Sequence, residues 1–254
     1  MDRARSVLSE ADDLLAAGRR AADPLAGTLR IGILPTISPY LLPGITPALR
    51  AAHPRLMPIW LEEKTESLLK SLDAVDLDAA LLALEAEIGD VEREIVAIDP
   101  FVLATREDDP LGASLSSVRP AQLRGKNVLL LDDGHCFREQ ALEYCSKAKA
   151  REVEFRATSL STLAQMVAGG AGVTLLPRLA VATEAQRAGL RVRPFAEPSP
   201  RRTIALVWRK RSPLAPALKQ VAGTIRGAYP RPDGRPRLKR AGGRVSTLAS
   251  IAAG

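Results

Sequence analysis

Short apolar runs alternate with longer amphipathic segments between Thr28 and Tyr229. The runs have the length and the bounding turn residues of β-strands, which predicts strands over Leu29–Leu34, Leu56–Leu61, Ala79–Leu84, Val91–Ile98, Phe101–Arg106, Val128–Leu131, Val153–Phe155, Gly172–Leu176, Leu190–Phe195 and Thr203–Trp208. Helices are predicted at Pro39–His53, Thr65–Leu72, the stretch that starts at Cys136, Leu160–Ala168 and Pro216–Tyr229. Strands that alternate with helices indicate βαβ units, an α/β fold and a mostly parallel sheet.

The two ends of the chain have other patterns. Residues 2–20 place their apolar side chains on one stripe, which predicts an amphipathic helix that needs a partner. Residues 230–254 are rich in Gly, Pro and Arg, so we expect a disordered tail there. That tail has six basic residues against Asp233 alone, and so carries +5 of the net charge of +7. A basic tail attracts phosphate without reading sequence, and the chain has no recognisable DNA-reading motif.

Composition excludes several classes of protein. No apolar stretch reaches the roughly 18 residues needed to cross a bilayer. The charged N-terminus lacks the apolar core of a signal peptide, so we expect the chain in the cytoplasm, away from membranes. The two cysteines and the two histidines, His53 and His135, do not have the spacing of a zinc site. We therefore expect no metal and no other cofactor.

The two cysteines, Cys136 and Cys145, lie nine residues apart in one segment that follows a predicted strand and an Asp132-Asp133-Gly134 turn. A cysteine in the first turn of a helix is placed to ionise, because the helix N-terminus favours negative charge. His135 and Arg138 flank it, whereas the two aspartates oppose ionisation if they point toward the thiol. Structural disulfides are rare in the cytoplasm, so the pair indicates a redox switch. Outside such a motif, a free cysteine is more often a small buried apolar residue.

The segment GHCFREQALEYC (134–145) resembles the sensing segment of the OxyR family, the LysR-type transcription regulators that respond to hydrogen peroxide. Three further stretches agree with that family: LRIGILPTISPYLLPGITPAL (29–49), FRATSLSTLAQMVAGGAGVTLLP (155–177) and PRRTIALVWR (200–209). The resemblance covers about residues 1–229 and includes no winged helix-turn-helix domain. We therefore expect the chain to begin partway through a longer regulator, with a remnant of the linker helix at 1–26.

The resemblance implies a fold of two Rossmann-like subdomains of the type II periplasmic-binding-protein kind, joined by two crossovers. Residues 27–98 and 201–229 would form regulatory subdomain I. Residues 99–200, with both redox cysteines, would form subdomain II, and residues 230–254 would be the disordered basic tail. A cleft would separate the two subdomains.

The resemblance also implies the function of a sensor and not of an enzyme. Peroxide would oxidise Cys136 to a sulfenic acid, Cys145 would then close a disulfide, and the remodelled segment would change the oligomer. The residues that match the family's peroxide-binding and thiolate-supporting positions are Thr36, Thr65, His135, Gln140 and Arg202. The implied partners are hydrogen peroxide, a second copy of the chain in a homodimer, a tetramer in the full-length protein, operator DNA through the DNA-binding domain, and RNA polymerase.

Two other functions fit parts of the sequence. A LysR-type effector domain can bind a small metabolite in its cleft, and Thr158 and Ser159, at a predicted helix start, would then hold an anion with backbone amides. A thiol-dependent enzyme would use Cys136 as its nucleophile. Titration of thiols with peroxide separates these functions, because a sensor loses two thiols per chain and an enzyme turns over repeatedly.

Overall fold

The computed structural model describes residues 25–114, 116–133 and 136–230, and for Cys136 only the backbone. Residues 1–24 of the predicted linker helix, His135 and residues 231–254 of the predicted tail lie outside the described residues.

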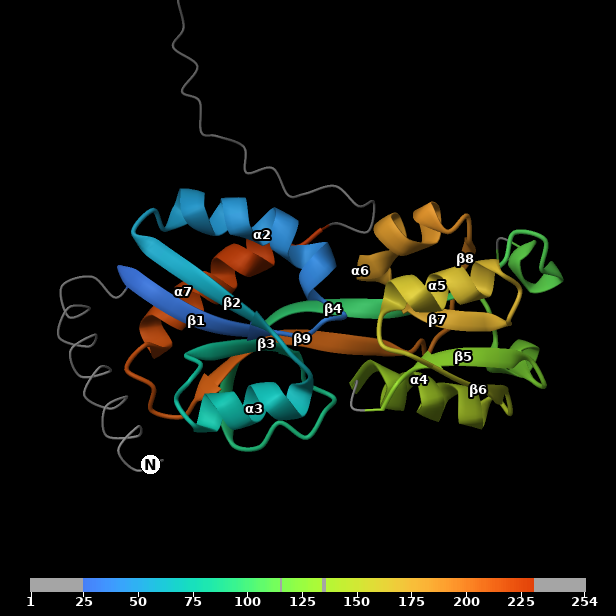
Figure 1. Ribbon diagram of the computed structural model, residues 1–254, viewed down its shortest axis with the longest axis horizontal. Helices are drawn as coiled ribbons and strands as arrows, with labels where there is room; N and C mark the ends of the chain where they lie inside the picture. Colours follow the sequence, from blue (N-terminus) through green and yellow to red (C-terminus); the bar gives the residue numbers. More distant parts are fainter. Residues whose placement is uncertain (1–24, 115, 134–135, 231–254) are drawn as a thin grey trace, which may run out of the picture.

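Nine strands form one sheet that runs the length of the molecule (Figure 1). Its two ends are parallel: β1 (Gly27–Ile33) pairs with β2 (Leu56–Glu62) and β3 (Ala79–Ala83), and β5 (Asn127–Leu131) pairs with β6 (Arg151–Ala157) and β7 (Val173–Pro177). The middle is antiparallel, because β4 (Val91–Thr105) and β9 (Arg201–Arg209) pair with each other and with β3 and β7, while β8 (Arg191–Pro194) pairs with β4.

The prediction of an α/β fold is confirmed, but the prediction of a mostly parallel sheet is wrong. The chain crosses from one half to the other along β4 and returns along β9, so the two strands lie side by side in opposite directions. The two strands predicted at 91–98 and 101–106 are one strand. Pro100 removes a single donor, and the next amide, that of Phe101, still donates to the carbonyl oxygen of Pro200 at 2.8 Å.

Helices cover the faces of this sheet (Figure 1). They are α2 (Ser38–Ala52), α3 (Thr65–Asp73), α4 (Cys136–Lys147), α5 (Leu160–Ala168) and α7 (Ala215–Ala228), together with the short helical segments η1 (Pro110–Gly112), η2 (Pro120–Leu123), α6 (Arg178–Ala180) and η3 (Val181–Ala185). The five longer helices lie where the apolar periodicity predicts them. None of the helices in the described ranges combines the length and the apolar character needed to cross a membrane.

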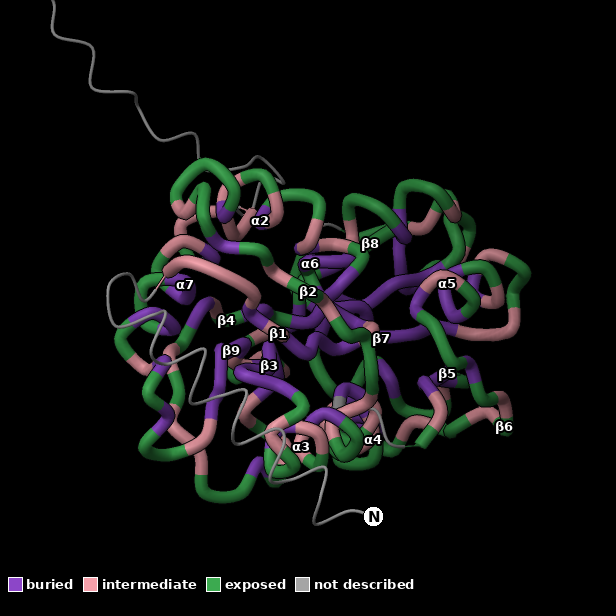
Figure 2. The backbone as a smooth tube through the Cα atoms, turned by 60° about the vertical axis from the view of Figure 1, so that its left-hand side comes forward, coloured by how far each residue is buried: buried purple, intermediate pink, exposed green. Residues whose placement is uncertain are grey.

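Two apolar cores lie under these helices, and β4 runs from one into the other (Figure 2). The first core packs α2, α3 and α7 against β1, β3 and β9. The second packs α4 and α5 against β5, β7 and the end of β4. β4 contributes Val96 to the first core and Phe101 to the second, so the chain passes from one core to the other around Asp99 and Pro100.

Candidate functional site

A buried ion pair lies where β4 and β9 pass between the cores. Asp99 and Arg202 are register partners, and their side chains are 1% and 0% exposed. Arg202 donates from Nε to Asp99 Oδ2 at 3.0 Å, and its Nη2 lies 2.9 Å from the same oxygen. Burial raises the pKa of the Asp99 carboxyl, while the Arg202 guanidinium and the N–H of Leu179, which donates to Oδ1 at 3.0 Å, favour the ionised form.

Thr36, which follows β1, completes this buried group. Arg202 Nη1 donates to Thr36 Oγ1 at 2.9 Å, and Nη2 donates to the Thr36 carbonyl oxygen at 3.0 Å. Because a guanidinium only donates, the Thr36 hydroxyl accepts here and keeps its own hydrogen for another acceptor. No described residue accepts that hydrogen. The structure therefore brings together two of the residues predicted from the sequence.

Helix α4 begins at Cys136, as the sequence predicts, directly after β5 and its aspartate turn. The buried ring of Phe137 packs edge-on against Phe101, with ring centroids 4.8 Å apart. Phe101 lies two residues after Asp99, so this contact holds the first turn of α4 beside the buried ion pair. The N-terminus of a helix favours a thiolate over a thiol.

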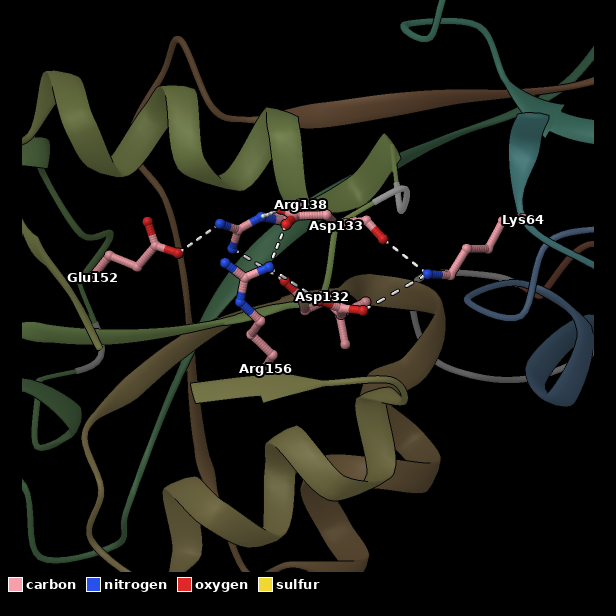
Figure 3. Close-up of polar contacts among 7 residues, drawn as sticks. Lys64, Asp132, Asp133, Arg138, Glu152 and Arg156 are labelled. Carbon is pink, nitrogen blue, oxygen red and sulfur yellow. Dashed lines mark hydrogen bonds and ion pairs between the residues drawn. The ribbon is translucent and has the colours of Figure 1, made fainter. Parts of the chain in front are cut away.

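The two aspartates before Cys136 are paired with cations (Figure 3). Asp133 accepts from Arg138 Nε at 2.8 Å and also from Arg156, and Arg156 lies 3.6 Å from Asp132. The Arg156 guanidinium, and after it that of Arg138, holds the pKa of Asp133 below its usual value. The sequence left open whether these carboxylates oppose thiol ionisation, and the structure shows that neither carboxylate is left uncompensated.

The start of α3 faces this turn from the other core. Lys64, which precedes α3, donates from Nζ to the carbonyl oxygen of Asp133 at 2.8 Å. Thr65 is the first residue of α3, and its Oγ1 is buried without a hydrogen-bond partner among the described residues. An unpaired buried hydroxyl is unfavourable by about 1–3 kcal/mol, so this one suits a site that takes a polar ligand.

Gln140, one turn after Cys136, also has a buried polar atom without a hydrogen-bond partner among the described residues. Its Nε2 donates to Glu85 Oε2 at 3.3 Å, and its Oε1 is buried and unpaired within the described part of the chain. Glu85 Oε1 in turn accepts from the N–H of Thr203 at 2.6 Å, next to Arg202. Gln140 is thus linked through Glu85 to the strand that carries Arg202.

Cys145 is a free thiol in the second core and is 4% exposed. Burial, reinforced by the negative charge of Glu152, raises its pKa to about 12, so it is protonated at neutral pH. In the continuous helix α4, nine steps separate Cys145 from Cys136 by about 13.5 Å along the axis and about 180° around it. A disulfide needs α-carbons about 4.4–6.8 Å apart, so this conformation is the dithiol form.

The residues of the metabolite hypothesis are arranged less favourably. Thr158 and Ser159 are exposed, and the Ser159 hydroxyl accepts the N–H of Thr162 as the N-cap of α5. A cavity of about 720 Å³ is lined by residues of β4, α6 and η3, together with Tyr40 and Tyr229. Within the described ranges, His, Cys, Asp and Glu side chains form no group suited to a metal ion.

The LysR substrate binding domain family matches residues 22–230. The chain is 44% identical over 228 residues to the DNA-binding transcriptional dual regulator OxyR of Escherichia coli K12, an alignment that covers 89% of this chain and 74% of that protein. A crystal structure of the oxidised form of OxyR, 44% identical, matches with a TM-score of 0.73 over 80% of this chain and 96% of that chain. A hydrogen-peroxide-bound OxyR mutant of Corynebacterium glutamicum, 32% identical, matches with a TM-score of 0.77 over 88% and 71%.

Proposed function

Since the chain belongs to the OxyR-type LysR regulators, we propose that it senses hydrogen peroxide through Cys136. Family membership also confirms the predicted type II periplasmic-binding-protein-like fold. The observation that carries the proposal is that the segments with the predicted residues meet in two contacts. Arg202 on β9 bonds to Thr36 after β1, and Lys64, just before α3, bonds to the turn before Cys136.

The reaction uses these groups in turn. The Cys136 thiolate attacks one peroxide oxygen, the O–O bond breaks, and hydroxide leaves and takes a proton to become water. The charge of Arg202 and the hydroxyl hydrogen of Thr36 stabilise the departing oxygen. Thr65, Gln140 and His135, the last of which lies outside the described residues, complete the proposed peroxide site.

The Cys145 thiol then attacks the sulfenic sulfur, water leaves, and a disulfide forms. Because α4 holds the two cysteines too far apart, it must unwind for this step. The result is two discrete arrangements of one segment, as a switch requires. We take the two cores as the predicted subdomains, 27–98 with 201–229 and 99–200.

Transmission of the signal follows the family pattern. The proposed partners are a second copy of the chain, operator DNA through a DNA-binding domain of the longer regulator, and RNA polymerase. The cytoplasm is the proposed compartment. The chain belongs to a family of regulators, and we propose that it reacts stoichiometrically with peroxide and does not turn over as an enzyme.

Mass mapping of thiols before and after a short peroxide pulse tests the function. The chain should lose both thiols, and a dithiol reductant should restore them. Cys136→Ser should abolish fast oxidation, whereas Cys145→Ser should still react and accumulate a sulfenic acid that dimedone traps. A faster reaction at Cys145 would reverse the roles, and repeated turnover without a reductase would indicate an enzyme.

A further inference from the structure

We propose that Lys64 is a positioning residue for Cys136: it fixes the turn before α4 and supplies the positive charge that favours the Cys136 thiolate. This inference rests on the proposed function, because it concerns the thiol that meets peroxide. Neither the cysteine motif nor the family's peroxide-binding positions include Lys64.

Lys64 makes a polar contact that crosses between the cores. It stands just before α3 in the first core, and its Nζ donates to the Asp133 carbonyl oxygen at 2.8 Å. The same nitrogen lies 3.9 Å from Asp132 Oδ2. Figure 3 shows the Lys64 side chain extending toward the Asp132–Asp133 turn. A bond to a backbone oxygen fixes the peptide itself, so it restrains the turn at Asp133.

The charges around the turn explain why the cation matters. Three cations, Lys64, Arg138 and Arg156, face three carboxylates, and this balanced group is the turn cluster: Lys64, Asp132, Asp133, Arg138, Glu152 and Arg156. Arg138 is shared between Asp133 and Glu152, at 2.8 Å and 2.7 Å. Removal of Lys64 leaves one net negative charge beside the helix terminus at which the thiolate forms, and a like charge disfavours ionisation.

Lys64 is also the member of the turn cluster that comes from the first core. Arg138 belongs to α4 and Arg156 to β6, so both move with the second core. Lys64 adjoins Thr65, whose buried hydroxyl is unpaired in the described part of the chain. A single side chain thus sets the charge at the turn and holds the Thr65 end of α3 against it.

The test uses the Cys145→Ser background, in which Cys136 is the one thiol. The pH dependence of alkylation by iodoacetamide gives the ionisation midpoint, and stopped-flow mixing with hydrogen peroxide gives the oxidation rate. Lys64→Met should raise the midpoint and slow oxidation at neutral pH by about threefold to tenfold, the effect of one partly exposed charge. Lys64→Arg should recover most of the ionisation midpoint and of the oxidation rate, because arginine also donates hydrogen bonds and stays charged.

Lys70→Met is the matched control. Lys70 lies on α3, six residues after Lys64, but its side chain is 74% exposed and pairs with Glu66 on the same helix. Lys70→Met should leave the ionisation midpoint and the oxidation rate of Cys136 unchanged. Melting curves should show that both methionine variants are folded. Equal midpoints and rates for Lys64→Met and Lys70→Met would overturn the inference. If peroxide leaves the parent thiol unreacted, the proposed sensing function fails, and the alkylation midpoints still decide whether Lys64 supports ionisation.

Discussion

Arg202→Met should destabilise the fold strongly, although Arg202 is also proposed to assist the chemistry. Because the Arg202 side chain is fully buried, the loss of stability is expected whatever its effect on oxidation. Methionine matches much of the volume of arginine but cannot pair with Asp99, which is 1% exposed. Removal of one partner of a buried ion pair is unfavourable by about 3–5 kcal/mol, because the other charge stays buried.

A loss of about 3–5 kcal/mol is a large share of the free energy of unfolding of a domain. Domains are stable by about 5–15 kcal/mol, and for a domain of this size each kcal/mol shifts Tm by about 2–4 °C, so Tm should fall by about 6–20 °C. The loss should shrink at low pH. Without Arg202, burial holds the pKa of folded Asp99 above its value of about 3.9 in the unfolded chain. The folded state of Arg202→Met then binds the Asp99 proton more tightly than the unfolded chain does. The loss of stability is therefore complete above the pKa of folded Asp99, and it becomes smaller as pH falls toward about 4.

Urea denaturation at neutral and mildly acidic pH measures this effect. Arg201→Met is the matched control, because Arg201 is the exposed neighbour on the same strand and should change stability by less than about 0.5 kcal/mol. The double variant with Asp99→Asn should be more stable than Arg202→Met alone, because no charge is then left unpaired. A loss below about 1 kcal/mol for Arg202→Met, or no recovery in the double variant, would refute the reasoning.

Three other outcomes follow from the same contacts. Thr36→Val should slow oxidation of the reactive thiol in stopped-flow experiments, and Thr36→Ser should restore the rate, because the hydroxyl hydrogen is the group in question. In Cys136→Ser, alkylation of Cys145 should be slow and should keep rising with pH well beyond the value of about 8.5 for a free thiol, since its pKa is about 12; a plateau near pH 9 would contradict that burial. Disulfide formation should raise amide exchange across residues 136–150 with little change in 29–98, and an intact α4 in verified disulfide-bonded protein would exclude the unwinding.

The elements that could be predicted are those whose signals are local. The prediction for α5 matches its observed bounds because Ser159 caps one end and Gly169 follows the other. The segment from Arg178 to Ala185 was not predicted, because it combines an α-helix of three residues with a π-helical turn. Such a segment has no sustained amphipathic period. The antiparallel middle of the sheet depends on which distant strands meet, and periodicity within one strand does not contain that information.

The residues of the site also differ in whether the sequence alone could predict them. Cys136 at a helix start follows from the local pattern, and Thr36 and Arg202 were reached through the resemblance. Asp99 was missed although it is the one charge in the run Ala97–Ala104, which is otherwise apolar apart from Pro100. A lone carboxylate in a predicted core strand needs a buried cation, and that signal was available. Its partner lies 103 residues away, so the pairing itself required the fold.

The contacts that hold α4 differ in kind from those that hold the two crossing strands together, and this difference suits a switch. Lys64 and Gln140 make polar contacts between the first core and α4 with its turn. Such partly exposed polar contacts contribute about 0–1 kcal/mol each. Unwinding must also release Phe137, whose burial contributes about 1.5–3 kcal/mol. The Asp99–Arg202 pair lies on the strands and not in the segment between the cysteines, so the segment can refold while the pair stays buried. The fold therefore joins the segment that must move to the first core by partly exposed polar contacts, and keeps the buried charge pair on strands outside that segment.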